Sequence, residues 1–305
     1  MRQEFYYPSC GGGMIHGCRW MPEGAPRAIL QLVHGIAEHI ARYDAFATFM
    51  AQNGFLVVAE DHMGHGASIG EGETAGYFEG GWERAVADCY QLLLDTRRDH
   101  PHLPYVLLGH SMGSFLVRTM LIRYPEAPLT AVVLSGTAWM PAGVLNAGLA
   151  TAKLICKLGG ERNCSKLLNA MMFGSYNGRI HNPRTTHDWL TRDAACVDAY
   201  VADPLCGFVV TSGLARDMLG GMRGNQQPQK MEKMNKRLPV LFLAGDADPV
   251  GDYGKGVRCA RAAFEKAGME RTDLLLYPQG RHEMLNETNK LDVYADLLGW
   301  IGQNL

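Results

Sequence analysis

The sequence predicts an open α/β fold in which helices flank a mostly parallel central sheet. Short apolar runs bounded by turn residues alternate with segments of helical periodicity, which is typical of parallel strands buried on both faces. One long section between two such runs has no strand pattern and shows helical spacing instead. Together, these observations predict a sheet core with an inserted helical cap.

The strand-like runs are expected to carry the site, because chemistry in open α/β sheets gathers at the carboxyl ends of the strands. The predicted strands are residues 28–33, 55–59, 105–108, 131–134, 240–243 and 274–277. The predicted core helices are residues 42–53, 82–98, 112–124, 256–267 and 291–301. The residues that follow each strand are therefore the first candidates for function.

The predicted cap covers residues 139–227, and the core consists of residues 1–138 and 228–305. Loops and lids at this edge of a sheet usually carry function, so we expect the cap to lie over the site. A lateral helical subdomain without a role in the site is the alternative. The helix-like pieces of the cap are residues 144–158, 164–173, 193–202 and 208–219.

Composition bounds the class of protein and its partners. The 305 residues are 47% hydrophobic and 20% charged, which is ordinary for a globular protein with a sizeable core. A net charge of −2 gives no electrostatic reason to expect a nucleic-acid partner. No stretch approaches the ~20 apolar residues of a membrane span, and the opening residues lack the apolar segment of a signal peptide. We therefore expect a cytoplasmic protein, whose oligomeric state the sequence does not reveal.

The eight cysteines lie far apart and form no C-x-x-C pair. In the expected cytoplasmic setting they are predicted to be free thiols. His62 and His65 have a short spacing, but they lie in a Gly-rich loop without the glutamate of a known metal motif. The sequence therefore predicts no metal site.

The segment Gly109–Gly113 matches G-x-S-x-G, the nucleophile elbow, in which a sharp strand-to-helix turn exposes the serine hydroxyl. Ser111 follows an apolar strand and opens an apolar-periodic helix, which is the context that the motif requires. A second match at Gly66–Gly70 has loop on both sides, so Ser68 is interpreted as a coincidence. Ser111 is the predicted nucleophile.

A serine nucleophile needs a positioned base, and in this motif's fold the chain order is Ser, then an acid, then His. His282 lies beyond the later acidic residues and just after a predicted strand, so it is the predicted base. The acid is expected after the preceding strand, where Asp246, Asp248 and Asp252 are available. We favour Asp248, with Asp246 as the alternative. The carboxylate of Asp248 would keep the His282 ring in the tautomer that catalysis requires.

The oxyanion of a tetrahedral intermediate needs backbone donors. The residue after the nucleophile, Met112, is expected to supply one N–H, and the loop after an earlier strand a second. Ile36 is the candidate there, because Gly35 lets the backbone approach closely. His34 and His110 are predicted to be structural.

With these residues in place, the chain resembles the monoacylglycerol lipase and lysophospholipase branch of the α/β-hydrolases. The acid loop of that family favours Asp248 over Asp246. The resemblance covers essentially the whole core and weakens across the cap. It rests on His34–His39 with Arg42-Tyr43 (HGxxEHxxRY), Asp61–Gly66 (DxxGHG), Gly109–Gly113 (GHSMG), Gly245–Asp248 and His282.

The resemblance implies two-step hydrolysis of a carboxylic ester through an acyl-enzyme on Ser111, without a metal or an organic cofactor. It also implies a single-chain lipid ester as substrate, and the cap would allow transient contact with a membrane surface. Apolar cap residues would then line an acyl tunnel, although apolar residues at helical spacing more often simply pack the core of the cap. The candidates are Val144, Leu145, Leu149, Leu154, Ile155, Leu167, Leu168, Met171, Met172, Phe173, Met218 and Leu219.

Three alternatives remain open at this stage. A short-chain carboxylesterase or a proline iminopeptidase would use the same triad, and an aminopeptidase would also need acidic cap residues to hold a free amino terminus. A non-catalytic binding protein on the same scaffold is the alternative from another class, although such proteins are expected to lose part of the triad. Epoxide hydrolases and dehalogenases use an aspartate nucleophile, and Ser111 argues against them. The acidic cap residues are Glu161, Asp193, Asp198 and Asp203.

Overall fold

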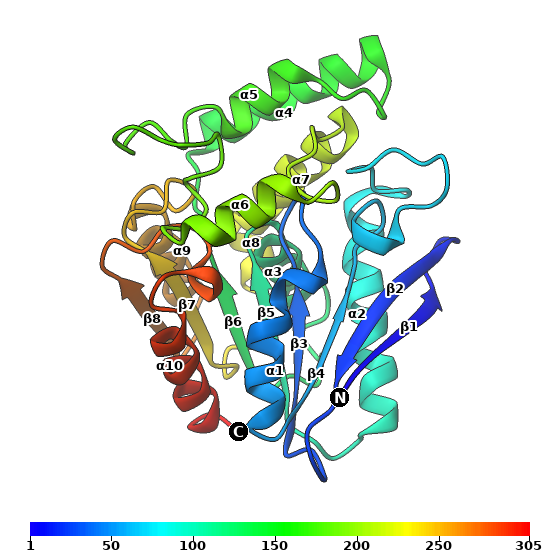
Figure 1. Ribbon diagram of the computed structural model, residues 1–305, viewed down its shortest axis with the longest axis vertical. Helices are drawn as coiled ribbons and strands as arrows, with labels where there is room; N and C mark the ends of the chain where they lie inside the picture. The colour runs from blue at the N-terminus through cyan, green and yellow to red at the C-terminus, as the bar shows by residue number, and fades with distance from the viewer.

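The computed structural model describes residues 1–305, and an eight-stranded sheet forms its centre (Figure 1). The strand order is β1-β2-β4-β3-β5-β6-β7-β8, and β3 to β8 are parallel while β1 and β2 run antiparallel at one edge. The predicted mostly parallel sheet is confirmed. The strands are β1 (Arg2–Pro8), β2 (Met14–Trp20), β3 (Ala28–Val33), β4 (Phe55–Glu60), β5 (Tyr105–His110), β6 (Ala131–Ser135), β7 (Val240–Gly245) and β8 (Thr272–Tyr277).

The central strands are buried along their whole length and mostly apolar, because helices cover both faces. Every residue of β3, β4 and β5 is buried. In β3, Ile29 and Val33 belong to the apolar core of one face, and Leu30 and Leu32 to the core of the other. A one-residue slip would exchange the two sets, so packing on both faces specifies the register.

Helices α1 and α10 pack on one face of the sheet, and α2, α3 and α9 pack on the other. Short 3-10 helices follow β3, β4 and β8. The helices outside the cap are α1 (Asp44–Gln52), α2 (Gly81–Asp99), α3 (Met112–Arg123), α8 (Pro228–Met231), α9 (Lys255–Lys266) and α10 (Lys290–Gly302); the 3-10 helices are η1 (Ile40–Tyr43), η2 (Gly66–Ser68) and η3 (Met284–Asn286).

The hairpin β1–β2 was not among the predicted strands. Its first strand lies at the sheet edge, where most of its residues are exposed and polar side chains are tolerated. A partly exposed edge strand lacks the continuous apolar run by which the central strands are recognised. The register pairs Arg2 with Trp20 and Pro8 with Met14.

The section between β6 and β7 contains helices and no strand of the sheet. Figure 1 shows α4 and α5 farthest from the sheet, with α6 and α7 between them and the strand ends. This helical section is hydrogen-bonded to the core, where the Asn225 side-chain amide donates to the Phe115 carbonyl of α3 at 2.8 Å. None of the helices has the length and apolarity that a bilayer span requires. The helices of this section are α4 (Ala142–Gly159), α5 (Lys166–Phe173), α6 (Ala194–Ala202) and α7 (Ser212–Asn225).

Candidate active site

Ser111 lies at a sharp turn between β5 and α3, with a φ of 52° and a ψ of −120°. A non-glycine residue with positive φ is strained, and such strain clusters at functional sites. Two glycines make the turn sterically feasible. A Cβ on Gly109 would lie 2.6 Å from the Gly113 carbonyl oxygen, and a Cβ on Gly113 would lie 2.1 Å from that of Val33. The glycines of G-x-S-x-G thus allow α3 to pack against the sheet while Ser111 lines a cavity under the cap.

His282 and Asp248 are both buried, and His282 Nδ1 lies 3.0 Å from Asp248 Oδ2. The other oxygen of Asp248 accepts the Val250 N–H at 2.8 Å, so the carboxylate is held at both ends. Asp246, the alternative acid, is exposed and accepts the Gln279 N–H at 2.6 Å. The structure therefore brings Asp248 to His282 and gives Asp246 a role in joining two loops.

The second ring nitrogen of His282, Nε2, is buried and has no hydrogen-bond partner in the protein. The ring lines the same cavity as Ser111. It packs against Gly136, where a Cβ would approach His282 Cε1 to 2.9 Å, and against the Trp189 ring at 5.2 Å between centroids. This leaves Nε2 available to exchange a proton with a group in the cavity.

The pKa of His282 reflects two opposing effects. Burial lowers it, but the charge of Asp248 and the hydrogen bond to that carboxylate raise it, and the net result is a pKa above the ordinary value of 6.5. The neighbouring His110 is 4.8 Å away between ring centroids. Burial and the proximity of His282 lower the pKa of His110 to about 4, so this ring stays neutral.

The predicted oxyanion donors, Ile36 and Met112, both line the cavity beside Ser111. Neither backbone N–H forms a hydrogen bond to another protein group. Met112 is the first residue of α3, where the helix leaves N–H groups unpaired and its dipole favours negative charge. A Cβ on Gly35 would lie 3.1 Å from Ser111 Cβ, so the glycine lets the loop approach Ser111 closely.

An ion-pair network that sequence reasoning did not assign supports this loop. Arg42 donates to Glu38 at 2.6 Å and to both oxygens of Glu283 at 2.6 and 2.7 Å. Glu38 in turn accepts the Gly35 N–H at 2.6 Å and the Tyr43 hydroxyl at 2.8 Å. Burial opposes ionisation of Glu283, but Arg42 lowers the pKa of this carboxyl to about 2. Residues of the E-H-x-x-R-Y signature thus fix the turn that carries Ile36.

Arg42→Met is expected to destabilise the fold by about 3–5 kcal/mol, because it leaves two buried carboxylates without their cation. Denaturant unfolding monitored by circular dichroism measures this loss. Arg98→Ala is the matched control, since Arg98 is 73% exposed in its pair with Asp95 and is expected to contribute about 0–1 kcal/mol. A loss below about 1 kcal/mol for Arg42→Met would show that the network does not stabilise the loop.

Several other residues singled out by the sequence are structural. His34 Nδ1 lies 2.7 Å from the Gly35 carbonyl oxygen, and its Nε2 accepts the His62 N–H at 3.0 Å. Asp61 accepts backbone N–H groups from Ile40, at the start of η1, at 2.8 Å and from Ala67 at 2.9 Å. This histidine and this aspartate tie together the loops after β3 and β4.

Ser68, in the second G-x-S-x-G match, is buried and does not line the cavity. Its hydroxyl donates to the Asp61 carbonyl oxygen at 2.7 Å and accepts the His16 N–H at 2.8 Å. Both hydrogen-bonding capacities of the hydroxyl are therefore used within the fold.

The cavity has a volume of about 1340 Å³, and 23 of its 43 lining residues are hydrophobic. It extends from Ser111 and His282 along the helical section between β6 and β7. Leu145 and Leu149 of the candidate tunnel set pack in the core instead, and Leu154, Ile155 and Leu167 do not reach the cavity. The candidates that do line it are Val144, Leu168, Met171, Met172, Phe173, Met218 and Leu219.

The acidic cap residues that an aminopeptidase would need do not line this cavity. Asp193 caps the N-terminus of α6, and Asp203 pairs with His39. Glu161 and Asp198 form ion pairs with Arg216 and Arg184 on the surface. None of these four carboxylates is therefore free in the cavity to hold an amino terminus.

Comparisons with known proteins agree with this geometry. Residues 24–289 match the family model described as serine aminopeptidase, S33. The chain is 31% identical to a monoacylglycerol lipase of Mycolicibacterium smegmatis over 100% of this chain and 98% of that protein. It is 30% identical to the monoglyceride lipase of Mus musculus, covering 94% of this chain and 87% of the relative.

Solved structures show the same fold. A thermostable carboxyl esterase from Bacillus coagulans superimposes with a TM-score of 0.92 at 28% identity, covering 99% of this chain and 98% of that one. A monoglyceride lipase from Saccharomyces cerevisiae superimposes with a TM-score of 0.79 at 17% identity, covering 100% and 95%. The predicted fold is confirmed, and the chain belongs to the serine aminopeptidase S33 family of α/β-hydrolases.

Proposed function

We propose that the chain is a carboxylic ester hydrolase that cleaves single-chain lipid esters, as a monoacylglycerol lipase or a lysophospholipase. The observation that carries this proposal is the large, mostly apolar cavity that begins at Ser111 and runs beneath the cap. The relatives named monoacylglycerol and monoglyceride lipases support the same substrate class.

The proposed mechanism follows from the geometry. Ser111 Oγ attacks the ester carbonyl while His282 Nε2 takes the hydroxyl proton, and Asp248 holds Nδ1–H and stabilises the imidazolium. The N–H groups of Ile36 and Met112 stabilise the oxyanion. His282 then protonates the leaving alcohol, and the acyl chain stays on Ser111 until water, activated by the same histidine, releases the fatty acid.

The cavity favours a long acyl chain. Its volume of about 1340 Å³ exceeds the ~300–1,000 Å³ typical of small-molecule sites. Met171, Met172, Met218 and Met222 line it, and methionine adapts its shape to chains of different length. An apolar chain also fits a wall that lacks cap carboxylates.

The cap, residues 139–227, is proposed as a lid that makes transient contact with a membrane surface. On α4 and α5, the apolar side chains of Leu154, Leu158 and Leu167 are 56%, 77% and 60% exposed. Lys153 and Lys157 lie on the same stretch of α4 and would favour anionic lipid headgroups. Contact of this kind would place the cavity close to its substrate.

The function is tested by measuring kcat/KM on medium- and long-chain monoacylglycerols, lysophosphatidylcholine, short-chain esters and a prolyl amide. Preference for a monoacylglycerol or the lysophospholipid supports the proposal and decides between the two. Preference for short-chain esters would overturn the lipid assignment while keeping the ester chemistry. Turnover of the prolyl amide alone would favour a peptidase.

Ala147→Phe is expected to lower kcat/KM for long-chain monoacylglycerols relative to short-chain esters by about 10-fold or more. Ala147 is an exposed residue of α4 on the cavity wall, so a ring there occupies space that a long chain uses. Asn146→Phe is the matched control, because this neighbouring α4 residue is exposed and does not line the cavity. An unchanged ratio in Ala147→Phe would contradict an acyl path along α4.

A further inference from the structure

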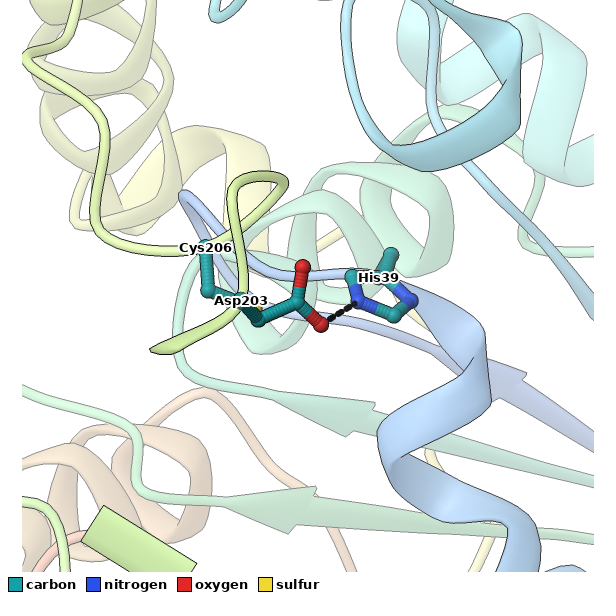
Figure 2. A group of neighbouring side chains, drawn as sticks. All are labelled: His39, Asp203 and Cys206. Atoms are coloured by element: carbon teal, nitrogen blue, oxygen red, sulfur yellow. Dashed lines mark hydrogen bonds and ion pairs between the residues drawn. The ribbon is translucent and has the colours of Figure 1, made fainter. Parts of the chain in front are cut away.

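A second group of chemically competent side chains lies where the cap meets the core. Figure 2 shows His39, Asp203 and Cys206, which no step of the proposed reaction uses. His39 precedes η1, while Asp203 caps the C-terminus of α6 and Cys206 follows it in the same loop. One ligand atom from each residue lies within 4.8 Å of the others.

The donor set suits a borderline metal ion. Imidazole nitrogen, carboxylate oxygen and cysteine sulfur are the ligands of protein zinc sites, at bond lengths of about 2.0–2.3 Å. His39 Nε2 lies 2.8 Å from Asp203 Oδ2 in a hydrogen-bonded ion pair. Two ligands of a tetrahedral zinc ion lie about 3.3 Å apart, so a small separation of these two atoms would admit the ion. Asp203 Oδ1 accepts the Leu205 N–H at 2.8 Å, which orients the carboxylate in the way that outer hydrogen bonds orient metal ligands.

Solvent access and charge balance also favour metal binding by these three residues. The side chains of His39 and Asp203 are 12% and 29% exposed, so an ion can enter and keep a water as its fourth ligand. A thiolate and a carboxylate together neutralise a divalent cation. The nearby cation Arg42 is already paired with Glu38 and Glu283.

A second cluster, Glu60, His62 and Cys89, has similar donors but differs in access. All three residues are buried, and Glu60 also accepts the Tyr7 hydroxyl. Cys89 donates to Glu60 at 3.3 Å, and the side chains of His62 and Glu60 are 0% exposed, so an ion has no path to them. Of the two clusters, His39, Asp203 and Cys206 are therefore the one that a metal ion can reach.

We propose that His39, Asp203 and Cys206 bind a divalent transition metal, zinc by preference, and that the ion joins the cap to the loop carrying Ile36. The same seam already holds that loop, since the Ala37 carbonyl accepts the Gly207 N–H at 2.9 Å and the Tyr200 hydroxyl at 3.0 Å. Ala37 has a strained φ of 53° and directly follows Ile36. A bound metal ion would therefore restrain opening of the cap. The effect on cap opening rests on the proposed function, whereas metal binding itself does not.

Metal binding is tested first with Co²⁺ added to the EDTA-treated full-length chain. The proposal predicts one Co²⁺ per chain, a cobalt–thiolate charge-transfer band, and displacement of Co²⁺ by Zn²⁺. Cys206→Ser removes the band, while Cys259→Ser, which changes an exposed cysteine on α9, keeps it. No band in the parent chain, or a band that persists in Cys206→Ser, would overturn the site.

A second measurement does not depend on the thiol or on ester turnover. At free Zn²⁺ about 100-fold above its Kd, the unfolding equilibrium constant of the parent chain is expected to fall about 100-fold. His39→Asn and Asp203→Asn are each expected to lose this stabilisation, measured against their own metal-free unfolding curves. Equal stabilisation of the parent and both variants would assign Zn²⁺ to another site and refute the proposal, whatever ester the enzyme hydrolyses.

Discussion

Ser111→Ala is expected to lower kcat on a monoacylglycerol by about 10⁴-fold or more, with the fold and KM nearly unchanged. The variant removes only the hydroxyl oxygen on which the acyl-enzyme is proposed to form. The alanine methyl retains the contacts of the turn, and the oxyanion donors Ile36 and Met112 remain. The measurement is fatty-acid release, with a thermal melt to show that the variant is folded.

Ser68→Ala is the matched control for this experiment. It changes the serine of the second G-x-S-x-G match, which is buried and hydrogen-bonded away from the cavity. This control is expected to cost stability, about 1–3 kcal/mol for the groups left without a partner, and to retain kcat within about 10-fold. If Ser111→Ala kept more than a tenth of the parent kcat, another nucleophile would have to be sought.

Asp248→Asn is expected to lower kcat by about 10⁴-fold, because an amide at this position stabilises neither the correct tautomer nor the imidazolium of His282. Asp246→Asn is the control, since Asp246 is exposed and its contact to the Gln279 N–H can be kept by the asparagine oxygen. Its effect is expected to stay within about threefold, the range of a surface substitution. Loss of activity in Asp246→Asn but not in Asp248→Asn would reverse the assignment.

The pH dependence of the same pair gives a second readout with a defined sign. Neutral His282 is the proposed base, so kcat/KM is expected to fall as the pH falls through its pKa, which lies above 6.5 because Asp248 outweighs burial. In Asp248→Asn the charge is lost and burial remains, so the acid limb of the residual activity shifts to lower pH. A limb that does not move would mean that Asp248 does not set the pKa of the base.

Much of the core was predictable from the sequence because its signals are local. Strands β3 to β7 are continuous apolar runs, and the elbow at Ser111 joins one of them to an apolar-periodic helix. Strand β1 was not predicted because it is largely exposed, and β2 because His16, Gly17 and Arg19 interrupt its apolar residues. Asp246 and Asp248 follow the same strand, so only the folding of their loop shows which one reaches His282.

The remaining features depend on contacts between distant parts of the chain. Arg42 and Glu283 are 241 residues apart, and His39 and Asp203 are 164 apart, so no local pattern relates them. In the cap, helical spacing indicates that one face is buried. It does not distinguish Leu145, which packs in the core, from Val144, which lines the cavity.

The central claim is that an acyl-enzyme forms on Ser111 with His282 as its base. Labelling of the parent chain with a fluorophosphonate, followed by peptide mass spectrometry, tests it most directly. We expect one modified site, Ser111, complete loss of esterase activity with its modification, and no labelling of Ser111→Ala. Modification of another residue, or full activity in chains labelled at Ser111, would contradict it.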